Sequence, residues 1–140
     1  MNSHPSIQCV VFDLGGVLIE LDGPPVSPAN NQLGEEAIWQ RWLQSPAVRQ
    51  YESGRCDRVA FAEQMIREMG LDDSVDQFLS HFEMWPTGFF PESAGILQIL
   101  SRRVKLACLS NTNELHWERF SKQREIYDLF DMTFLSFKLG

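Results

Sequence analysis

A short apolar run at residues 9–12, Cys-Val-Val-Phe, stops abruptly at Asp13 and is followed by the glycine pair Gly15 and Gly16. The run has no polar alternation, which is typical of a strand buried on both faces of a parallel sheet. A strand of this kind suits a sheet with helices on both faces. The run therefore favours an α/β fold.

The later sequence supplies those elements. It predicts a helix at residues 91–103, an apolar strand at 104–109, a polar turn at 110–113, a helix from about Glu114 and a strand at 132–137. A strand, a helical insertion and then helix–strand–helix–strand indicate an α/β fold with a Rossmann-like parallel sheet core. We assign residues 1–19 and 88–140 to this core and residues 20–87 to an inserted helical cap.

Within the cap, local signals predict where helices begin and end. Ser45, Asp57 and Ser74 stand where N-caps would stand, whereas Gly54 and Gly70 stand where helices would end. Residues 22–31 are rich in Pro, Gly and Asn and are interpreted as a loop, and residues 85–88 are expected to break the helical block.

Composition excludes several classes of protein. The 12 basic and 19 acidic residues give a formal net charge of −7, which argues against a nucleic-acid or anionic-membrane surface. No apolar stretch is long enough to span a membrane, and the first residues, MNSHPS, do not form a secretory leader. The three cysteines, Cys9, Cys56 and Cys108, form no metal pattern and fit reduced thiols in the cytoplasm.

Polar residues follow two of the predicted core strands. Asp13 comes after the first, and Ser110 and Asn111 come after the strand at 104–109. Ligands of open α/β sheets bind beyond the carboxyl ends of the strands. Asp13 could be a nucleophile, a metal ligand or both, and Ser110 with its neighbouring N–H groups could hold phosphate oxygens.

These two segments resemble known motifs. Residues 10–18, VVFDLGGVL, resemble the first motif of the haloacid dehalogenase-like (HAD) superfamily, and residues 106–111, LACLSN, resemble its second. The helical segment falls where that family inserts a cap. The sequences DLGGVL and SNTNELH resemble the motifs of the bacterial branch that contains sugar-phosphate phosphatases such as glucose-1-phosphate phosphatase.

The resemblance implies a reaction. Asp13 would attack the phosphorus of a small phosphomonoester and form an aspartyl-phosphate that water later hydrolyses. Mg²⁺ would be held by the Asp13 carboxylate and the Gly15 carbonyl oxygen, and phosphate would be bound by Gly15, Gly16, Ser110 and Asn111, with Ser110 assisting catalysis. The substrate class would be a small phosphorylated metabolite, such as a sugar phosphate.

The chain departs from the family pattern in two places. The general acid and base is usually an aspartate two residues after the nucleophile, where this chain has Gly15, although such assistance is worth about 10²–10⁴-fold. Glu20 and Asp22 are candidates for a substitute general acid, although the favoured interpretation is that both are surface loop residues. The family's third motif, a lysine, and its fourth, an acidic pair, are expected downstream, and Lys138 falls too early for that lysine.

The second departure has a structural consequence. Without the strands that follow those motifs, the strand at residues 9–12 would be an exposed apolar edge. We therefore expect the 140-residue chain to be an inactive fragment, or to be completed by its C-terminal segment, another polypeptide or a dimer.

Several alternatives stay open. The protein could be a catalytically dead or truncated binding or regulatory module, or a metal-independent haloacid dehalogenase. Asn113 and His116 could contact a substrate, but helix capping and a satisfied surface histidine are the favoured interpretations. Trp39, Trp42 and Trp85 could stack on a sugar, although their spacing favours core packing.

Overall fold

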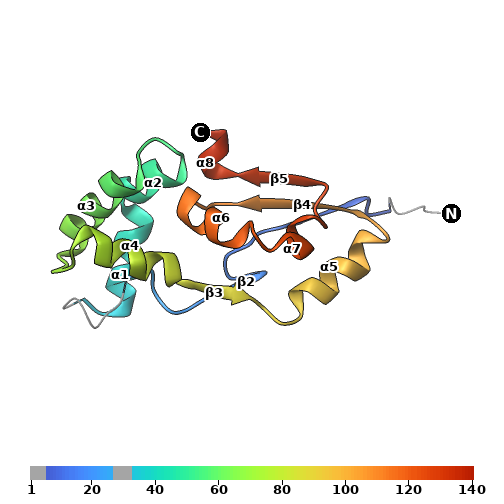
Figure 1. Cartoon of the computed structure of the whole chain (residues 1–140), viewed down its shortest axis with the longest axis horizontal. Helices are drawn as coiled ribbons and strands as arrows, with labels where there is room; N and C mark the ends of the chain where they lie inside the picture. The colour runs from blue at the N-terminus through green and yellow to red at the C-terminus, as the bar shows by residue number, and fades with distance from the viewer. Residues whose placement is uncertain (1–5, 27–32) are drawn as a thin grey trace.

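The computed structural model describes residues 6–26 and 33–140 as an elongated α/β molecule with a sheet at one end and a helical cap at the other (Figure 1). Its three-stranded parallel sheet has the order β1-β4-β5. The strands are β1 (Cys9–Phe12), β4 (Lys105–Ser110) and β5 (Met132–Leu135). The predicted α/β class is confirmed. The interpreted loop at 22–31 lies partly outside the described residues.

One face of this sheet carries the core of its domain. Leu106 and Cys108 of β4 are fully buried, and Val10 and Phe12 of β1 pack against the same cluster. Three helices supply the opposing side chains: α5 (Ser93–Ser101), α6 (Glu114–Phe120) and α7 (Arg124–Tyr127). The pairing of Val10 with Leu106 and of Phe12 with Cys108 keeps all four side chains on this face.

The opposite face of the sheet is apolar and exposed. Val11 is 57% exposed and Leu109 56%, and Met132 and Phe134 are also exposed. Strand β1 is at one edge of the sheet, as the sequence predicted. No element of the described segments buries these side chains, so a large apolar surface faces solvent.

Among the described residues, the cap has four helices: α1 (Glu35–Gln44), α2 (Pro46–Glu52), α3 (Arg58–Met69) and α4 (Val75–Met84). Ser45, Asp57 and Ser74 each accept a hydrogen bond from a backbone N–H of the following turn, and Gly70 ends α3 in the left-handed region. These helix boundaries confirm the predicted caps. None of the described helices has the length and apolar character needed to cross a membrane.

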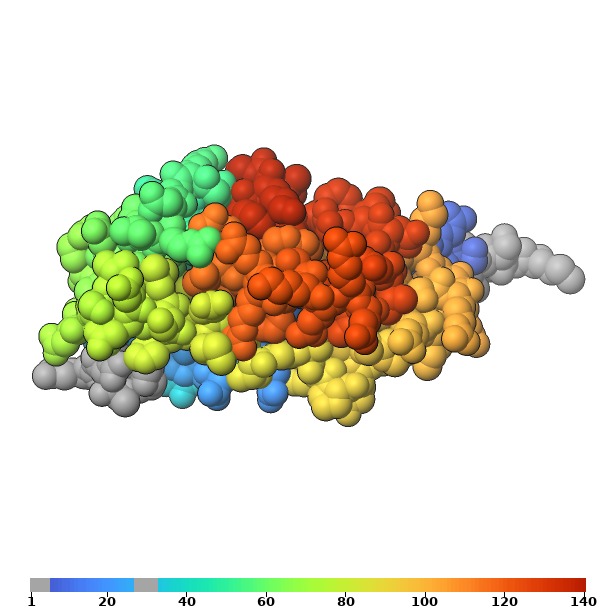
Figure 2. Space-filling model, viewed as in Figure 1, coloured from blue at the N-terminus to red at the C-terminus, as the bar shows by residue number. Residues whose placement is uncertain are grey.

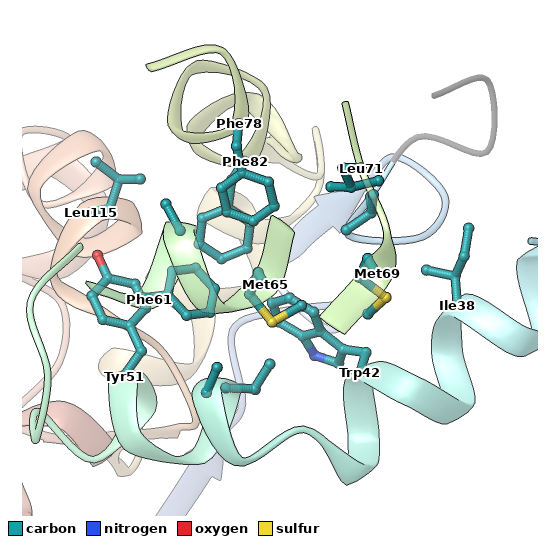
Figure 3. Packing of buried hydrophobic residues seen from close by; sticks show 14 residues of the cluster. Ile38, Trp42, Tyr51, Phe61, Met65, Met69, Leu71, Phe78, Phe82 and Leu115 are labelled. Carbon is teal, nitrogen blue, oxygen red and sulfur yellow. The ribbon is translucent and has the colours of Figure 1, made fainter. Parts of the chain in front are cut away.

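The four helices enclose an aromatic core of their own (Figure 3). Phe61 stacks on Tyr51, with ring centroids 4.3 Å apart, and lies edge-on to Trp42 at 6.3 Å. Trp42 is buried, and Trp39 and Trp85 are partly buried against it, so the core-packing interpretation of these tryptophans is confirmed.

The connection between cap and core differs from the prediction. Strand β2 (Ile19–Leu21) pairs antiparallel with β3 (Pro86–Phe89), where the sequence predicted only a break in the helical block. Pro86 takes the first position of its strand, where a missing N–H is tolerated. The last predicted strand is also shorter than expected, since residues 136–139 form the short helix α8 (Ser136–Leu139).

The cap also packs directly against the core. Figure 2 shows α6 and α8 lying against the helical cap. Arg58 of α3 forms ion pairs with Glu114 and Glu118 of α6, at 3.1 and 3.0 Å. Gly54, just after α2, lies so close to α8 that an added Cβ would overlap the Phe137 carbonyl oxygen.

The Gly54 contact makes a testable prediction about stability. Gly54→Ala should lower the free energy of unfolding by about 1–3 kcal/mol more than Gly70→Ala, because it adds overpacking against Phe137 to the strain of a left-handed backbone. Gly70 has nearly the same φ, 67° against 68°, and no atom within 4 Å of its added Cβ. Equal losses in urea denaturation would show that α2 does not pack on α8 in solution.

Candidate functional site

The carboxyl ends of β1 and β4 form the site. Because the two strands are parallel and in register, Asp13 and Ser110 emerge at the same edge of the sheet. They share a surface hollow, which we call the strand-end hollow. It is lined by Val11, Asp13, Leu109, Ser110, Asn111, Ser136 and Leu139.

Asp13 presents an accessible carboxylate in this hollow. The residue is exposed, and its Oδ1 accepts a hydrogen bond from the N–H of Leu14 at 2.7 Å. Cys108 lies beneath, and burial, with a smaller effect from the negative charge of Asp13, raises the pKa of its thiol to about 12. Because the thiol stays protonated at neutral pH, the carboxylate is the stronger candidate nucleophile.

The two glycines after Asp13 behave differently. Gly16 has φ of 74°, and its N–H donates to the Ile19 carbonyl oxygen at 2.8 Å, so this N–H already has a partner. No backbone N–H of the described residues donates to the Gly15 carbonyl oxygen. A Cβ at Gly15 would make an ordinary contact of 3.6 Å with Leu21, so the backbone there could carry a side chain.

Ser110 is 4% exposed and lies where both hollows of the site meet. Its Oγ is 3.5 Å from the Asn111 carbonyl oxygen, which is long for a hydroxyl hydrogen bond. The hydroxyl therefore has capacity for a ligand. Ser136 fixes the following turn, since its Oγ accepts the N–H of Thr112 and donates to the Thr112 carbonyl oxygen, both at 3.0 Å.

A second hollow, the cap-facing pocket, lies between this edge and the cap. It shares Ser110 and Asn111 with the strand-end hollow and includes Gly15. Trp85 and Glu52 line it from the cap side. The structure therefore places Asp13, Gly15, Ser110 and Asn111 around two adjoining hollows, whereas Gly16 lines neither of them.

Asn113 and His116 link the core to the cap. The Asn113 side chain accepts the N–H of His116 at 3.0 Å and caps α6, as the favoured interpretation predicted. The expectation of a surface histidine is wrong: His116 is 8% exposed, because its ring packs against Phe82 in the cap. Burial lowers the pKa of its imidazole to about 4.

Both ring nitrogens of His116 have partners. Nε2 lies 2.7 Å from the Phe82 carbonyl oxygen, and Nδ1 lies 3.1 Å from the Asn113 amide nitrogen. Since a carbonyl can only accept, Nε2 carries the proton and Nδ1 accepts from Asn113. A neutral histidine held in this way is a structural link.

Glu52 is the residue that sequence reasoning missed. It is half-buried at the end of α2, and burial raises the pKa of its carboxyl to about 7. No sequence signal marked it, because its neighbours in the pocket come from distant segments. The candidates Glu20 and Asp22 are exposed and line neither hollow, which agrees with their interpretation as surface residues.

The metal-binding potential of the site is partial. Across residues 6–26 and 33–140, no group of three or more His, Cys, Asp or Glu is placed to hold a metal ion. Mg²⁺, however, is usually bound through one or two carboxylates, substrate phosphate and waters. The Asp13 carboxylate and the open Gly15 carbonyl oxygen are ligands of that kind.

No protein-family model matches this chain. Among solved structures, it is similar to a HAD family enzyme from Bacteroides thetaiotaomicron, with 26% identity and a TM-score of 0.75 over 96% of this chain and 71% of that one. This chain is also similar to the structure of that enzyme in complex with magnesium and inorganic phosphate, with 26% identity, a TM-score of 0.74 and the same coverage of both chains.

L-2-haloacid dehalogenase from Xanthobacter autotrophicus, with chloropropionic acid covalently bound, has a similar fold. Its identity is 22% and its TM-score 0.54, over 93% of this chain and 57% of that chain. Both likenesses confirm the fold, and the likeness to the B. thetaiotaomicron enzyme supports membership of the HAD superfamily.

The buried His116 makes a prediction about pH. Its folded pKa of about 4 is below the ordinary histidine pKa of 6.5, so the unfolded state binds more protons between these values. The stability that depends on neutral His116 is therefore complete above pH 6.5 and is lost as pH falls toward 4. The stability difference between wild type and His116→Gln should shrink by about 2 kcal/mol from pH 7.5 to pH 5 in urea denaturation.

His81→Gln provides the control, because His81 is exposed on the same cap helix that His116 contacts. Its difference from wild type should stay constant over this range. A constant difference for His116→Gln as well would mean that the imidazole titrates normally and is not buried.

Proposed function

We propose that this site hydrolyses a small phosphomonoester, with Asp13 as the nucleophile and Mg²⁺ as the cofactor. The observation that carries the proposal is the exposed Asp13 carboxylate beside the Ser110 hydroxyl, at the carboxyl edge of a parallel sheet. The complex of the similar B. thetaiotaomicron enzyme with magnesium and inorganic phosphate supports it.

The proposed reaction has two steps, and Asp13 and Ser110 act in both. An Asp13 oxygen forms a bond to phosphorus while the bond from phosphorus to the leaving oxygen breaks, which gives an aspartyl-phosphate. Water then attacks that phosphorus, and the bond to Asp13 breaks and restores the carboxylate. Ser110 and the backbone N–H groups beside it hold the phosphoryl oxygens during both steps. The N–H of Gly16 is not available to the phosphate, because it donates to the Ile19 carbonyl oxygen. Gly16 contributes only the left-handed backbone turn after Asp13.

When bound, Mg²⁺ would neutralise charge between the carboxylate and the phosphoryl group, which otherwise repel each other. Asp13 and the Gly15 carbonyl oxygen are the ligands that we propose from this chain. The substrate would occupy the cap-facing pocket, where Trp85 and Trp117 offer apolar surface to a small organic group such as a sugar. With a net charge of −7, we propose no nucleic-acid partner.

We also propose a cytoplasmic location, which the three free cysteines support.

A second function is haloacid dehalogenation, in which the same carboxylate attacks carbon and needs no metal. The observation behind this second function is the fold that the chain shares with L-2-haloacid dehalogenase. A catalytically dead binding module is the alternative from another class. It would retain phosphate binding at Ser110 without turnover.

Asp13→Asn should abolish Mg²⁺-dependent hydrolysis of 4-nitrophenyl phosphate by the protein that carries this sequence, because an amide cannot form the phosphoenzyme. EDTA should abolish it in the wild type. Asp22→Asn, an exposed change nearby, should leave the rate within about twofold, since surface substitutions away from a site have little effect. Equal rates for Asp13→Asn and wild type would refute the nucleophile. Release of halide from 2-chloropropionate in EDTA would support the dehalogenase instead.

The exposed sheet face supports a proposal about partners. Val11, Leu109, Met132 and Phe134 form an apolar surface beside the β1 edge, and such surfaces mark association sites. We propose that the 140-residue chain is covered here by a further polypeptide or by a second copy.

Light scattering of the 140-residue chain should therefore show a mass above 16.1 kDa, or a bound peptide in the mass spectrum. Phe134→Glu should reduce that association by about tenfold or more, because burying an unpaired charge costs several kcal/mol. A well-behaved monomer with no bound peptide would refute the proposal.

A further inference from the structure

The cap-facing pocket contains one acidic side chain among the residues that line it, Glu52. This residue is the last of α2, so it enters the pocket from the cap while Gly15, Ser110 and Asn111 enter from the core. Its carboxyl group accepts no hydrogen bond from the described residues and forms no ion pair with them. A half-buried carboxyl without a partner costs stability, which is typical of functional positions.

The environment of Glu52 keeps its carboxyl close to the midpoint of titration at neutral pH. Burial alone raises its pKa to about 7, and no neighbouring charge has a resolved effect. The other titratable groups that line the pocket are His116, which is neutral, and Tyr127, whose pKa is raised further by burial. Both forms of the Glu52 carboxyl are therefore populated, as a group that alternates between acid and base requires.

Two cations on the elements packed against α2 have partners other than Glu52. Arg58 of α3 is paired with Glu114 and Glu118, and Lys138 of α8 lies over the ring of Trp117, with Nζ 4.9 Å from the centroid. Neither of these two cations holds Glu52 in its ionised form.

The other candidates for proton transfer do not suit the role. Both nitrogens of His116 are engaged, and the low pKa of its imidazole keeps the ring neutral at neutral pH, with its one N–H bonded to the Phe82 carbonyl oxygen. Tyr127 keeps its proton, because burial raises the pKa of its phenol. Asp13 must be free to attack phosphorus.

We propose that Glu52 is the general acid and base of the phosphoryl transfer, supplied by the cap in place of the aspartate that Gly15 lacks. This inference rests on the proposed function of Asp13. In the first step, Glu52 gives its proton to the leaving oxygen as the phosphorus–oxygen bond breaks, and an alcohol departs. In the second step, the Glu52 carboxylate takes a proton from the water that attacks the aspartyl-phosphate. The cycle ends with a protonated Glu52, a free Asp13 carboxylate and inorganic phosphate.

Local packing fixes the position of this acid. Gly54, two residues later, has φ of 68°, and its N–H donates to the Tyr51 carbonyl oxygen at 3.0 Å. The absence of a side chain there lets this turn lie against the Phe137 backbone of α8. Glu52 therefore reaches the core pocket only while the cap is packed against the core.

The test compares two substrates whose leaving groups differ in basicity. Nitrophenolate leaves without a proton at neutral pH, whereas the alkoxide of glycerol 2-phosphate needs one. The measured quantity is the single-turnover rate of phosphoenzyme formation. Glu52→Gln should lower this rate by about 10²–10⁴-fold with glycerol 2-phosphate and by less than about tenfold with 4-nitrophenyl phosphate. Equal losses on both substrates, or no loss on either, would overturn the proposal.

Glu63→Gln is the matched control, because Glu63 is exposed on cap helix α3 and lines neither hollow. It should leave both rates within about twofold. Glu52→Gln should also stay folded. The raised pKa means that stability is lost as pH rises from 4.5 to 7, so replacing the carboxyl by an amide removes a cost at neutral pH.

A rescue experiment separates catalysis from structure. Gly15→Asp places a carboxyl where the family has its acid, and the added Cβ contacts only the Leu21 side chain, at 3.6 Å. The double variant should hydrolyse glycerol 2-phosphate at least about tenfold faster than Glu52→Gln alone. No restoration by a folded double variant would count against proton transfer by Glu52.

Failure of this inference is distinguishable from failure of the proposed function. If Asp13→Asn abolishes turnover but Glu52→Gln does not affect glycerol 2-phosphate, only the role of Glu52 is wrong. If wild type and Asp13→Asn act alike, the proposed function is wrong. Carbon-13 NMR of labelled glutamate then gives an independent result: a Glu52 carboxyl that titrates at the ordinary value near 4.5 would overturn the proposal without any assay.

Discussion

The parallel pairing of β1 with β4 is the constraint on which the site depends. Pairing Phe12 with Cys108 puts Asp13 one residue beyond the β1 end and Ser110 at the end of β4. A slip of one residue would turn Val10 and Phe12 away from the core cluster and bring Val11 into it. The burial of alternate apolar side chains therefore also fixes the distance between the candidate nucleophile and the hydroxyl.

The cap depends on the same edge. It leaves the core through β2 and returns through β3, and its polar contacts with α6 involve Arg58, His116 and Arg119. Arg119 donates to the carbonyl oxygen of Glu83, in the last turn of α4 where helix carbonyls lack internal partners, and to that of Pro86, the first residue of β3. The residue that caps α6, Asn113, follows Ser110 by three positions. The cap is thus anchored next to the sheet edge that carries Asp13 and Ser110.

The sequence predicted the features that depend on local patterns. The apolar run at 9–12, the N-caps at Ser45, Asp57 and Ser74, and the polar turn after β4 follow from neighbouring residues, and the structure has them. Strand β2 has three residues and no periodicity to recognise, so its pairing with β3 was missed. Glu52 could not be found from the sequence, because its significance comes from burial among residues more than thirty positions away.

Glu52 also bears on which reaction the site performs. A halide ion is a weak base and leaves carbon without a proton, so a dehalogenase has no use for an acid at the leaving group. An alkoxide leaving phosphorus needs one. A carboxyl held near the midpoint of its titration, at the pocket beside Ser110, therefore fits phosphoester hydrolysis better than dehalogenation. In the proposed mechanism that carboxyl comes from the cap and the nucleophile from the core, so the packing of the cap against the core brings the two groups to adjoining hollows.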